Sequence, residues 1–256
     1  MAISLTGCGG ARNSRVAISG AQEAGDRASP LAIDVSNQVG SVTILSGPGV
    51  KDWSVRTRVR QGQKRPVEEA VSAELVTAPE GRTLRVLAAH PDGAATDGYA
   101  INLTIRVPAA AGVRVRTGQG NVSIRNVNGP IDVQVGEGAD TPASGSQAAS
   151  DAKLAGNIDV RTNQAITTPV LLATPRGDVR LSATEGSSGA LDLTASQGSV
   201  EVRAPKGRMS NVRPGARQWR GEYNAATHPF RLFTGDGTVL VELGVPGTGA
   251  PRLGSR

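Results

Sequence analysis

The sequence predicts an all-β protein, a single-chain β-solenoid or β-helix in which short strands stack as repeated rungs. Three observations predict it: a repeat of about 21 residues in the C-terminal half, glycine at fixed places within that repeat, and aromatic residues at only 2% of a 256-residue chain. A fixed period of this length is typical of repeat architectures. A narrow core of small aliphatic side chains suits so few aromatic residues. The alternative is an ordinary antiparallel meander, in which turns also recur at short, regular intervals.

The repeat comprises two complete copies, residues 168–188 and 189–209. In each copy two short strands carry apolar residues at alternate positions, which a period of two places on one face. These residues are Val170, Leu172, Val179 and Leu181 in the first copy and Leu191, Leu193, Val200 and Val202 in the second. One copy cannot bury its own aliphatic stripe, so each is expected to stack on copies above and below, about 4.8 Å apart.

Glycine recurs where each expected strand begins after a corner, because glycine adopts a positive φ at little cost. The glycines assigned to rungs in this way are Gly40, Gly120, Gly129, Gly156, Gly177 and Gly198. Their spacing extends the rung pattern well beyond the two complete copies.

The expected β-solenoid domain spans residues 31–245. It would begin with strands over 31–107, continue as regular rungs over 108–209, and end with a cap and closing strands over 210–245. Residues 246–256 are rich in glycine and proline and are expected to form a loose tail.

Two segments interrupt the period. Residues 136–153 are polar and low in complexity, so they are expected to leave the stack as an excursion. Within residues 210–229, Trp219 stands where the next glycine of the repeat is due. This segment also contains Tyr223, and it is expected to cap the stack or to form a larger side loop.

Residues 1–30 are expected to form a lipobox-like leader and a polar tether. Leu5, Thr6, Gly7 and Cys8 have the shape of a bacterial lipobox, in which the cysteine is acylated and becomes the mature N-terminus. Cys8 is the only cysteine in the chain, so it forms no disulfide within the chain. The motif predicts a membrane-anchored lipoprotein of the cell envelope that faces the periplasm or the exterior.

Two features of the leader differ from a complete signal peptide. Only seven residues precede Cys8, and none of them is lysine or arginine. A start codon placed too far downstream would account for both features. The alternative is a free cysteine in a flexible tail.

The formal net charge of +6 raises the question of a nucleic-acid partner. The arginines, however, are spread singly over the expected strands, without a basic block and without interleaved aromatic residues that could stack on bases. We therefore expect no nucleic acid. Apart from the membrane reached through Cys8, a basic surface suits anionic envelope polymers or surface proteins.

The sequence contains no recognisable set of catalytic or metal-binding residues. The two histidines, His90 and His228, both lie beside proline in expected loops, and their spacing is not that of metal ligands. No G-x-S-x-G motif marks a nucleophile at a strand–helix turn. We expect a non-enzymatic protein without a cofactor or metal.

One set of charged residues occupies the same outward position of three successive units: Asp159, Arg180 and Glu201. At rung spacing, Arg180 would lie between the two carboxylates. We interpret the set as an exposed ladder of ion pairs, each worth about 0–1 kcal/mol. The alternative is a carbohydrate-active site, because paired carboxylates cleave glycosidic bonds.

The stretch Tyr99–Glu137 reads YAINLTIRVPAAAGVRVRTGQGNVSIRNVNGPIDVQVGE. A strand ending in Val-Pro, a short Ala/Gly link and repeated T-x-x-G-x-[VI]-x-[VIL] rungs resemble the bacterial family called putative adhesin, DUF4097. The rung pattern also fits Arg161–Ala204 and Thr234–Val241, so the resemblance covers about residues 30–243. It implies an extracytoplasmic β-solenoid, often with a signal or lipoprotein leader, and supplies no catalytic residues. The two interruptions depart from the family pattern and leave the rung count open.

Together these observations predict a non-enzymatic envelope lipoprotein, an adhesin or surface-interaction module. A cytoplasmic scaffold that polymerises end to end, like the bactofilins, is the first alternative, because the ends of a rung stack are unpaired sheet edges. The segment around Trp219 resembles a cap, which argues against filaments. A polysaccharide-active β-helix enzyme is the second alternative.

Overall fold

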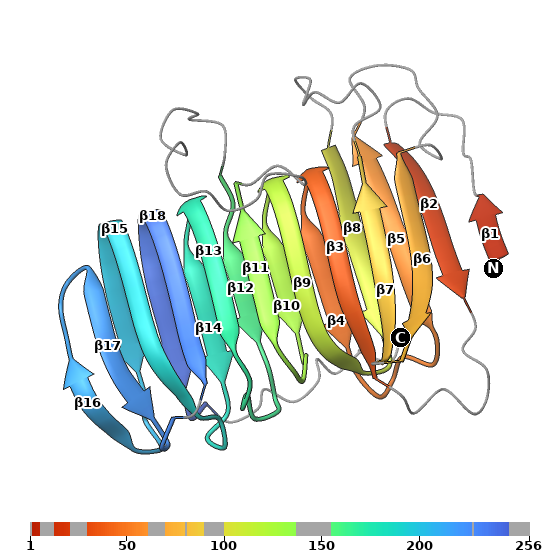
Figure 1. Cartoon of the computed structure of the whole chain (residues 1–256). Coiled ribbons are helices and arrows are strands. Elements are labelled where there is room, and N and C mark those ends of the chain that lie inside the picture. Colours follow the sequence, from red (N-terminus) through yellow and green to blue (C-terminus); the bar gives the residue numbers. More distant parts are fainter. Residues whose placement is uncertain are drawn as a thin grey trace, which may run out of the picture.

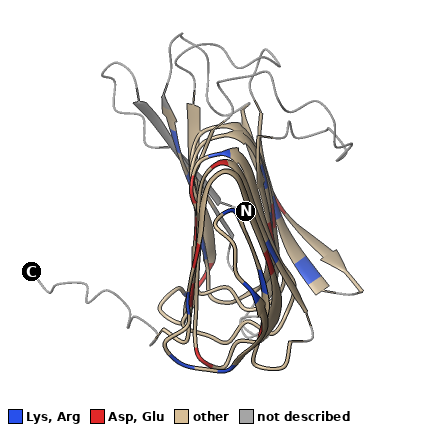
Figure 2. Ribbon diagram, turned by 90° about the vertical axis from the view of Figure 1, so that its left-hand side faces the viewer, with Lys and Arg blue, Asp and Glu red and all other residues tan. Residues whose placement is uncertain are grey.

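The computed structural model describes residues 2–5, 13–20, 30–60, 70–79, 81–89, 100–136, 155–226 and 228–245. Within these residues every regular element is a β-strand, and the strands form one hydrogen-bonded sheet of 18 strands. The sheet folds into two walls that face each other, so it is nearly closed and resembles a flattened barrel (Figures 1 and 2). The prediction of an all-β fold is confirmed.

We call the first wall wall A. It contains the strands from which the chain turns a corner into the opposite wall. In spatial order it contains β6 (Val71–Ala78), β7 (Gly81–Ala88), β3 (Leu31–Val39), β9 (Ala110–Gln119), β11 (Ile131–Val135), β13 (Val170–Arg176), the first halves of β18 (Pro229–Leu243) and β15 (Gly189–Arg203), β17 (Gln218–Tyr223) and β16 (Met209–Arg213). From β7 to β15 every neighbouring pair is parallel.

Wall B lies opposite and is built in the same way. In spatial order it contains β1 (Ala2–Leu5), β2 (Asn13–Gly20), β5 (Trp53–Arg60), β8 (Ala100–Val107), β4 (Val42–Ser46), β10 (Val122–Arg125), β12 (Ile158–Arg161), β14 (Val179–Ala183), and the second halves of β18 and β15. From β8 to β15 every neighbouring pair is parallel.

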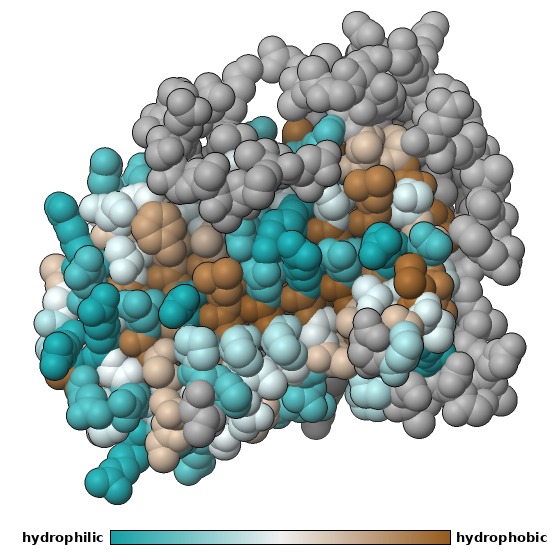
Figure 3. All heavy atoms as spheres, viewed as in Figure 1, coloured by the Kyte–Doolittle hydropathy of each residue, from teal (hydrophilic) through white to brown (hydrophobic). Residues whose placement is uncertain are grey.

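Most strands whose side chains the structure describes turn alternate side chains inward and outward, as their sequence pattern predicts. On the face shown in Figure 3, a band of apolar residues runs across the stack from strand to strand, and polar side chains border it. Among the described residues, the large apolar side chains that remain exposed are Leu87, Val212 and Phe233. They lie on β7, β16 and β18, which are distant strands of wall A.

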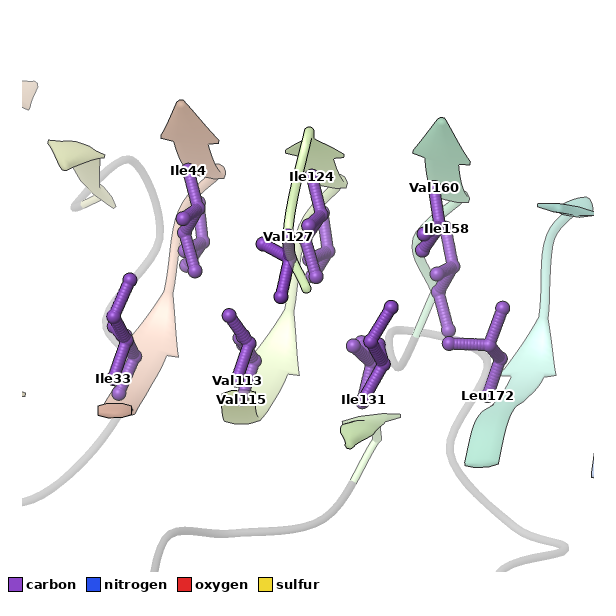
Figure 4. Close-up of a cluster of buried hydrophobic side chains, with 14 of the residues drawn as sticks. Ile33, Ile44, Val113, Val115, Ile124, Val127, Ile131, Ile158, Val160 and Leu172 are labelled. Carbon is purple, nitrogen blue, oxygen red and sulfur yellow. The ribbon is translucent and has the colours of Figure 1, made fainter. Parts of the chain in front are cut away.

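The inward side chains of both walls form one core. Figure 4 shows Ile33, Val113 and Ile131 from wall A pointing toward Ile44 and Ile124 from wall B. All five are at least 96% buried. At about 1.5–3 kcal/mol for each buried aliphatic side chain, this shared core is the main source of stability.

The chain alternates between the walls, so one strand of wall A and one of wall B make a circuit. The circuits do not follow one another in sequence order. The first circuit consists of β3 and β4. It lies between two other circuits, one formed by β7 and β8 and the other by β9 and β10. The last circuit consists of β18 alone. It lies between the circuit of β13 and β14 on one side and β15 on the other.

The position of β18 corrects one prediction. Residues 168–188 and 189–209 were expected to stack directly, but residues 229–243 separate them. The reason is the amount of apolar surface that each strand offers. Five inward apolar side chains of β18, those of Phe230, Leu232, Val239, Val241 and Leu243, are at least 99% buried. The second half of β15 offers only Val200 and Val202, and neither is fully buried at the end of the stack.

Antiparallel strands extend both walls at one end of the stack and wall A alone at the other, because wall B ends there with the second half of β15. At one end β6 pairs with β7 on wall A, and β1 and β2 extend wall B beyond β5. At the other end β17 runs antiparallel to the first half of β15, and β16 pairs with β17. Residues 210–229 therefore contribute a hairpin to this end, and it buries Trp219 and Tyr223.

The expected polar tether is wrong for residues 13–20. This segment is strand β2, which pairs with β5 along its whole length and buries Ile18. Alternation of Val16 and Ile18 with small residues was the missed signal. Cys8, residues 137–153 of the expected excursion and the expected tail 246–256 lie outside the described residues.

Candidate functional site

The predicted charge ladder on wall B is only partly assembled. Asp159 and Arg180 do occupy opposite positions on neighbouring strands β12 and β14. Arg180 then faces Leu240 on β18, and Leu240 separates it from Glu201 on β15. The stacking of Arg180 between two carboxylates is therefore wrong, because β18 enters the stack at this point.

Asp159 belongs to a first ion-pair network with two arginines. Arg125 donates to one carboxylate oxygen at 2.7 Å, and Arg161 donates to the other at 3.0 Å. Burial raises the pKa of the Asp159 carboxyl, but the hydrogen bonds and charges of the two arginines outweigh it, so the pKa lies below its ordinary value.

Arg180 belongs to a second network, centred on Glu242. Its guanidinium contacts the Glu242 carboxylate at 2.6 Å, and the Ser182 hydroxyl donates to the same oxygen at 3.0 Å. Arg203 lies 3.6 Å from the other oxygen and also pairs with Glu201 at 2.6 Å. The hydrogen bond from Arg180 lowers the pKa of Glu242 more than burial raises it.

These pKa shifts bear on the polysaccharide-cleavage alternative. A general acid that protonates a glycosidic oxygen needs a carboxyl group with a raised pKa. The pKa values of Asp159 and Glu242 are shifted in the opposite direction, by arginines that occupy the carboxylate oxygens. These side chains are arranged to hold neighbouring strands together by ion pairs.

The corners where wall A leads into wall B contain a column of glycines that the sequence identified only in part. From strand to strand the column comprises Gly40, Gly120, Gly156, Gly177, Gly237 and Gly198. A Cβ atom on any of them would collide with a backbone oxygen of the neighbouring strand. Gly237 was missed as a member, because β18 was expected at the end of the stack. Gly129 lies instead at the opposite corner, against Ala111.

The residue after each of these glycines forms a second row, which we call the corner row. The side-chain oxygen of Asn121 accepts a hydrogen bond from the Asn157 amide at 2.9 Å, and Asn157 accepts one from Asp178 at 2.8 Å. Asp178 in turn accepts one from the Thr238 amide at 2.8 Å. The four successive circuits that carry these residues are thereby tied to one another. The recurring Gly-polar-aliphatic triplet was a signal that could have predicted this row.

The threonine of the T-x-x-G pattern also has a defined role. The Thr174 hydroxyl donates to the Gly156 and Arg176 carbonyl oxygens at 3.0 Å, and Thr234 donates to the Gly177 carbonyl at 2.7 Å. Both threonines are at least 99% buried. The two hydroxyls thereby bond the Gly156 and Gly177 carbonyl groups at the corner, and the Arg176 carbonyl also accepts from the Gly156 amide at 2.9 Å.

An open groove of about 640 Å³ lies along the opposite corners, where wall B leads into wall A. Its lining includes the prolines Pro30, Pro48 and Pro108 and the amides of Asn128 and Gln164. No charged side chain lines it.

A third feature of wall B is a set of exposed arginines at the N-terminal end of the stack. Arg56 and Arg58 on β5 and Arg106 on β8 all point outward. Within the described part of the chain, no ion pair or side-chain hydrogen bond involves them. We call these three residues the arginine face.

The remaining sequence-predicted residues do not form a site. Cys8 and His90 lie outside the described residues, and His228 is half-buried beside the start of β18. Among the described residues, no three His, Cys, Asp or Glu side chains cluster as metal ligands would. A search of the same residues for a helix able to cross a bilayer finds none.

No family model matches the chain, and no curated protein matches it in sequence. Solved structures do match. A putative cell adhesion protein from Clostridium sporogenes is similar over 91% of this chain and 100% of its own, with a TM-score of 0.54 and 10% identity. A putative adhesin from Bacteroides fragilis matches over 89% of this chain and 97% of its own, with a TM-score of 0.33 and 13% identity. The likeness to the Clostridium protein shows a shared fold.

Proposed function

We propose that this protein is a non-enzymatic surface-interaction module of the cell envelope, of the adhesin type, and that its circuits are the rungs of a β-solenoid. The observation that supports this function best is the shared fold with the Clostridium cell adhesion protein across nine-tenths of the chain. The glycine column and the corner row support the solenoid, because both recur on successive circuits.

Binding to envelope material tests the interaction role. The purified full-length chain would be mixed with isolated envelopes of the native host and sedimented. We expect saturable co-sedimentation, well above that of an unrelated soluble protein with the same net charge of +6. Sedimentation no greater than that of the reference protein would refute the role.

The lipid anchor on Cys8 is a separate part of the proposal. It would place the module at a membrane and leave both walls open to partners. In the native host, with the native upstream start, a clickable fatty acid should label the wild-type chain and not the Cys8→Ser variant. A labelled Cys8→Ser chain, or an unlabelled wild type, would contradict anchoring at this residue.

The polymerising scaffold receives less support. Parallel strands at an open end of a stack invite a second copy to pair. Here antiparallel strands extend both walls at one end but only wall A at the other, where the second half of β15 is left as a parallel edge of wall B. A bulge between Ser210 and Arg213 distorts β16, the outermost strand of wall A at that end. Bulges of this kind discourage edge-to-edge pairing.

A further inference from the structure

The outer face of wall B divides into two electrostatically different halves. Over β10, β12, β14, β18 and β15, arginines are paired with carboxylates of the same or a neighbouring strand. Over β2, β5, β8 and β4 the sequence contains arginines and no aspartate or glutamate. The arginine face lies in this second half.

The strand registers place the three arginines close together. Arg56 and Arg58 are two residues apart on β5, which separates them by about 6.8 Å along the strand. Arg106 lies opposite Ser54, so it is the diagonal neighbour of Arg56 at about 7–8 Å. On the other side of β5, Arg15 of β2 occupies the position opposite Arg58. Arg56, Arg58 and Arg106 thus share a patch that no described carboxylate neutralises.

A row of hydroxyl groups starts at the arginine face and crosses the wall. Arg56 lies opposite Thr104, Thr104 opposite Thr43, and Thr43 opposite Ser123. At about 4.8 Å per strand, the row extends about 14 Å from Arg56. None of the three hydroxyls has a hydrogen-bond partner among the described residues. We call Thr104, Thr43 and Ser123 the hydroxyl row.

We propose that the arginine face and the hydroxyl row form a binding site for an acidic polysaccharide that bears repeated carboxylate groups. The inference rests on the proposed envelope function and names the site and the ligand class. Guanidinium groups bind carboxylates through paired N–H donors, and the hydroxyl row offers donors and acceptors for sugar hydroxyls. A flat strand face suits an extended polymer that contacts several strands at once.

The composition of this face favours a polysaccharide over a nucleic acid. Proteins that bind single strands place aromatic side chains where bases can stack. The only aromatic residue on β4, β5, β8 and β10 is Trp53, which is 96% buried in the core. The outward positions instead carry arginines and, with the exception of Leu45, small residues that are mostly polar.

The test measures binding of polygalacturonate to the full-length chain at low ionic strength, with a neutral glucan as the reference polymer. In one variant the arginine face is neutralised by Arg56→Gln, Arg58→Gln and Arg106→Gln. The matched control carries Arg208→Gln, Arg213→Gln and Arg217→Gln, which removes the same charge from exposed side chains at the opposite end of the stack. A third variant, Thr43→Val with Thr104→Val, removes hydroxyls and keeps the charge.

We expect the wild type to bind polygalacturonate and not the glucan, with an affinity that falls as salt is added. The arginine-face variant should lose affinity at least about tenfold, whereas the control should change less than about twofold. The hydroxyl variant should lose affinity about threefold, a change that a purely electrostatic attraction would not produce.

Three results would overturn the site: equal losses in the arginine-face and control variants, no binding by the wild type, or tighter binding to duplex DNA than to polygalacturonate.

The outcome of this binding test can be separated from that of the envelope experiment. If the chain does not sediment with envelopes but the variants change its affinity for polygalacturonate as expected, the envelope function is refuted and the binding site is supported. If the chain sediments with envelopes but the wild type does not bind polygalacturonate, or the arginine-face and control variants lose affinity equally, the site is refuted and the envelope function remains.

Discussion

At the scale of single residues, the corners where wall A leads into wall B leave no room for a Cβ atom on the glycine column. The glycine column brings backbones of successive strands so close that a Cβ would overlap a carbonyl oxygen. Several of its members also have a positive φ, such as Gly177 at 125°. Beside the column, the corner row and the buried threonines satisfy the backbone groups that the corners expose. The glycine column, the corner row and the buried threonines thus allow the chain to turn from wall A into wall B.

Gly177→Ala should destabilise the fold strongly. The new Cβ would lie 2.6 Å from the Gly156 carbonyl oxygen, and the backbone has a φ that alanine avoids. Strain of this kind costs about 1–3 kcal/mol before the clash is included. Urea unfolding would measure the loss. Gly47→Ala is the matched control, because nothing lies within 4 Å of its Cβ, and a similar loss there would argue against a crowded column.

The two ion-pair networks predict how stability depends on pH. The pKa values of Asp159 and Glu242 are lowered in the folded chain, so the folded state binds protons less readily than the unfolded chain. Their contribution is complete above the ordinary carboxyl pKa and is lost as the pH falls through the lowered values. We expect the free energy of unfolding to decrease on acidification below about pH 5.

The variant Glu242→Gln tests whether protonation of this carboxylate contributes to the loss of stability at low pH. At pH 6 the variant should be about 1 kcal/mol less stable than the wild type, because Arg180 loses its charged partner. At a pH where Glu242 is protonated in the folded protein, the two chains should converge. A constant difference across the whole range would show that packing, rather than charge, stabilises this position.

At the scale of elements, the strands compete for the interior of the stack. β18 is apolar at its inward positions along both walls, and it occupies the place between two copies of the repeat. β15 carries the same pattern but ends wall B, where its second half has a neighbour on one side only. Burial thus favours placing the more apolar strand inside.

A pair of equivalent valines measures this difference. Val241 of β18 and Val202 of β15 lie opposite each other, but Val241 is fully buried and Val202 is half-buried. Val241→Ala should cost about 2 kcal/mol, and Val202→Ala about half of that. Urea unfolding of both variants provides the comparison. Equal costs would contradict the placement of β18 inside the stack.

At the scale of the whole molecule, the first and last circuits are each held between two others. β3 with β4 and the two halves of β18 have parallel neighbours on both sides. Antiparallel strands extend both walls at one end of the stack and wall A at the other, and they cover parallel edges at which another chain could pair.

Much of the strand content followed from the sequence, because it depends on local patterns. Alternating aliphatic residues predicted the strands around Ile44, Ile124 and Leu181, and the glycine spacing predicted most corners of the column. Strand β2 was missed because its apolar alternation is short. The corner row was missed although its polar residue follows each glycine. The proposed binding site could be predicted only in composition, as outward arginines without a basic block.

The sequence by itself thus determined that this chain is all-β, with inward aliphatic stripes and glycine at the corners, since each of these properties depends on one residue and its near neighbours. The tertiary structure alone decided which strands lie side by side. Similar repeat units offer similar faces to one another, so the order depends on how much each whole strand buries, and it places residues 229–243 between two copies that are adjacent in sequence. That order also decides which arginines find a carboxylate and which remain on the arginine face.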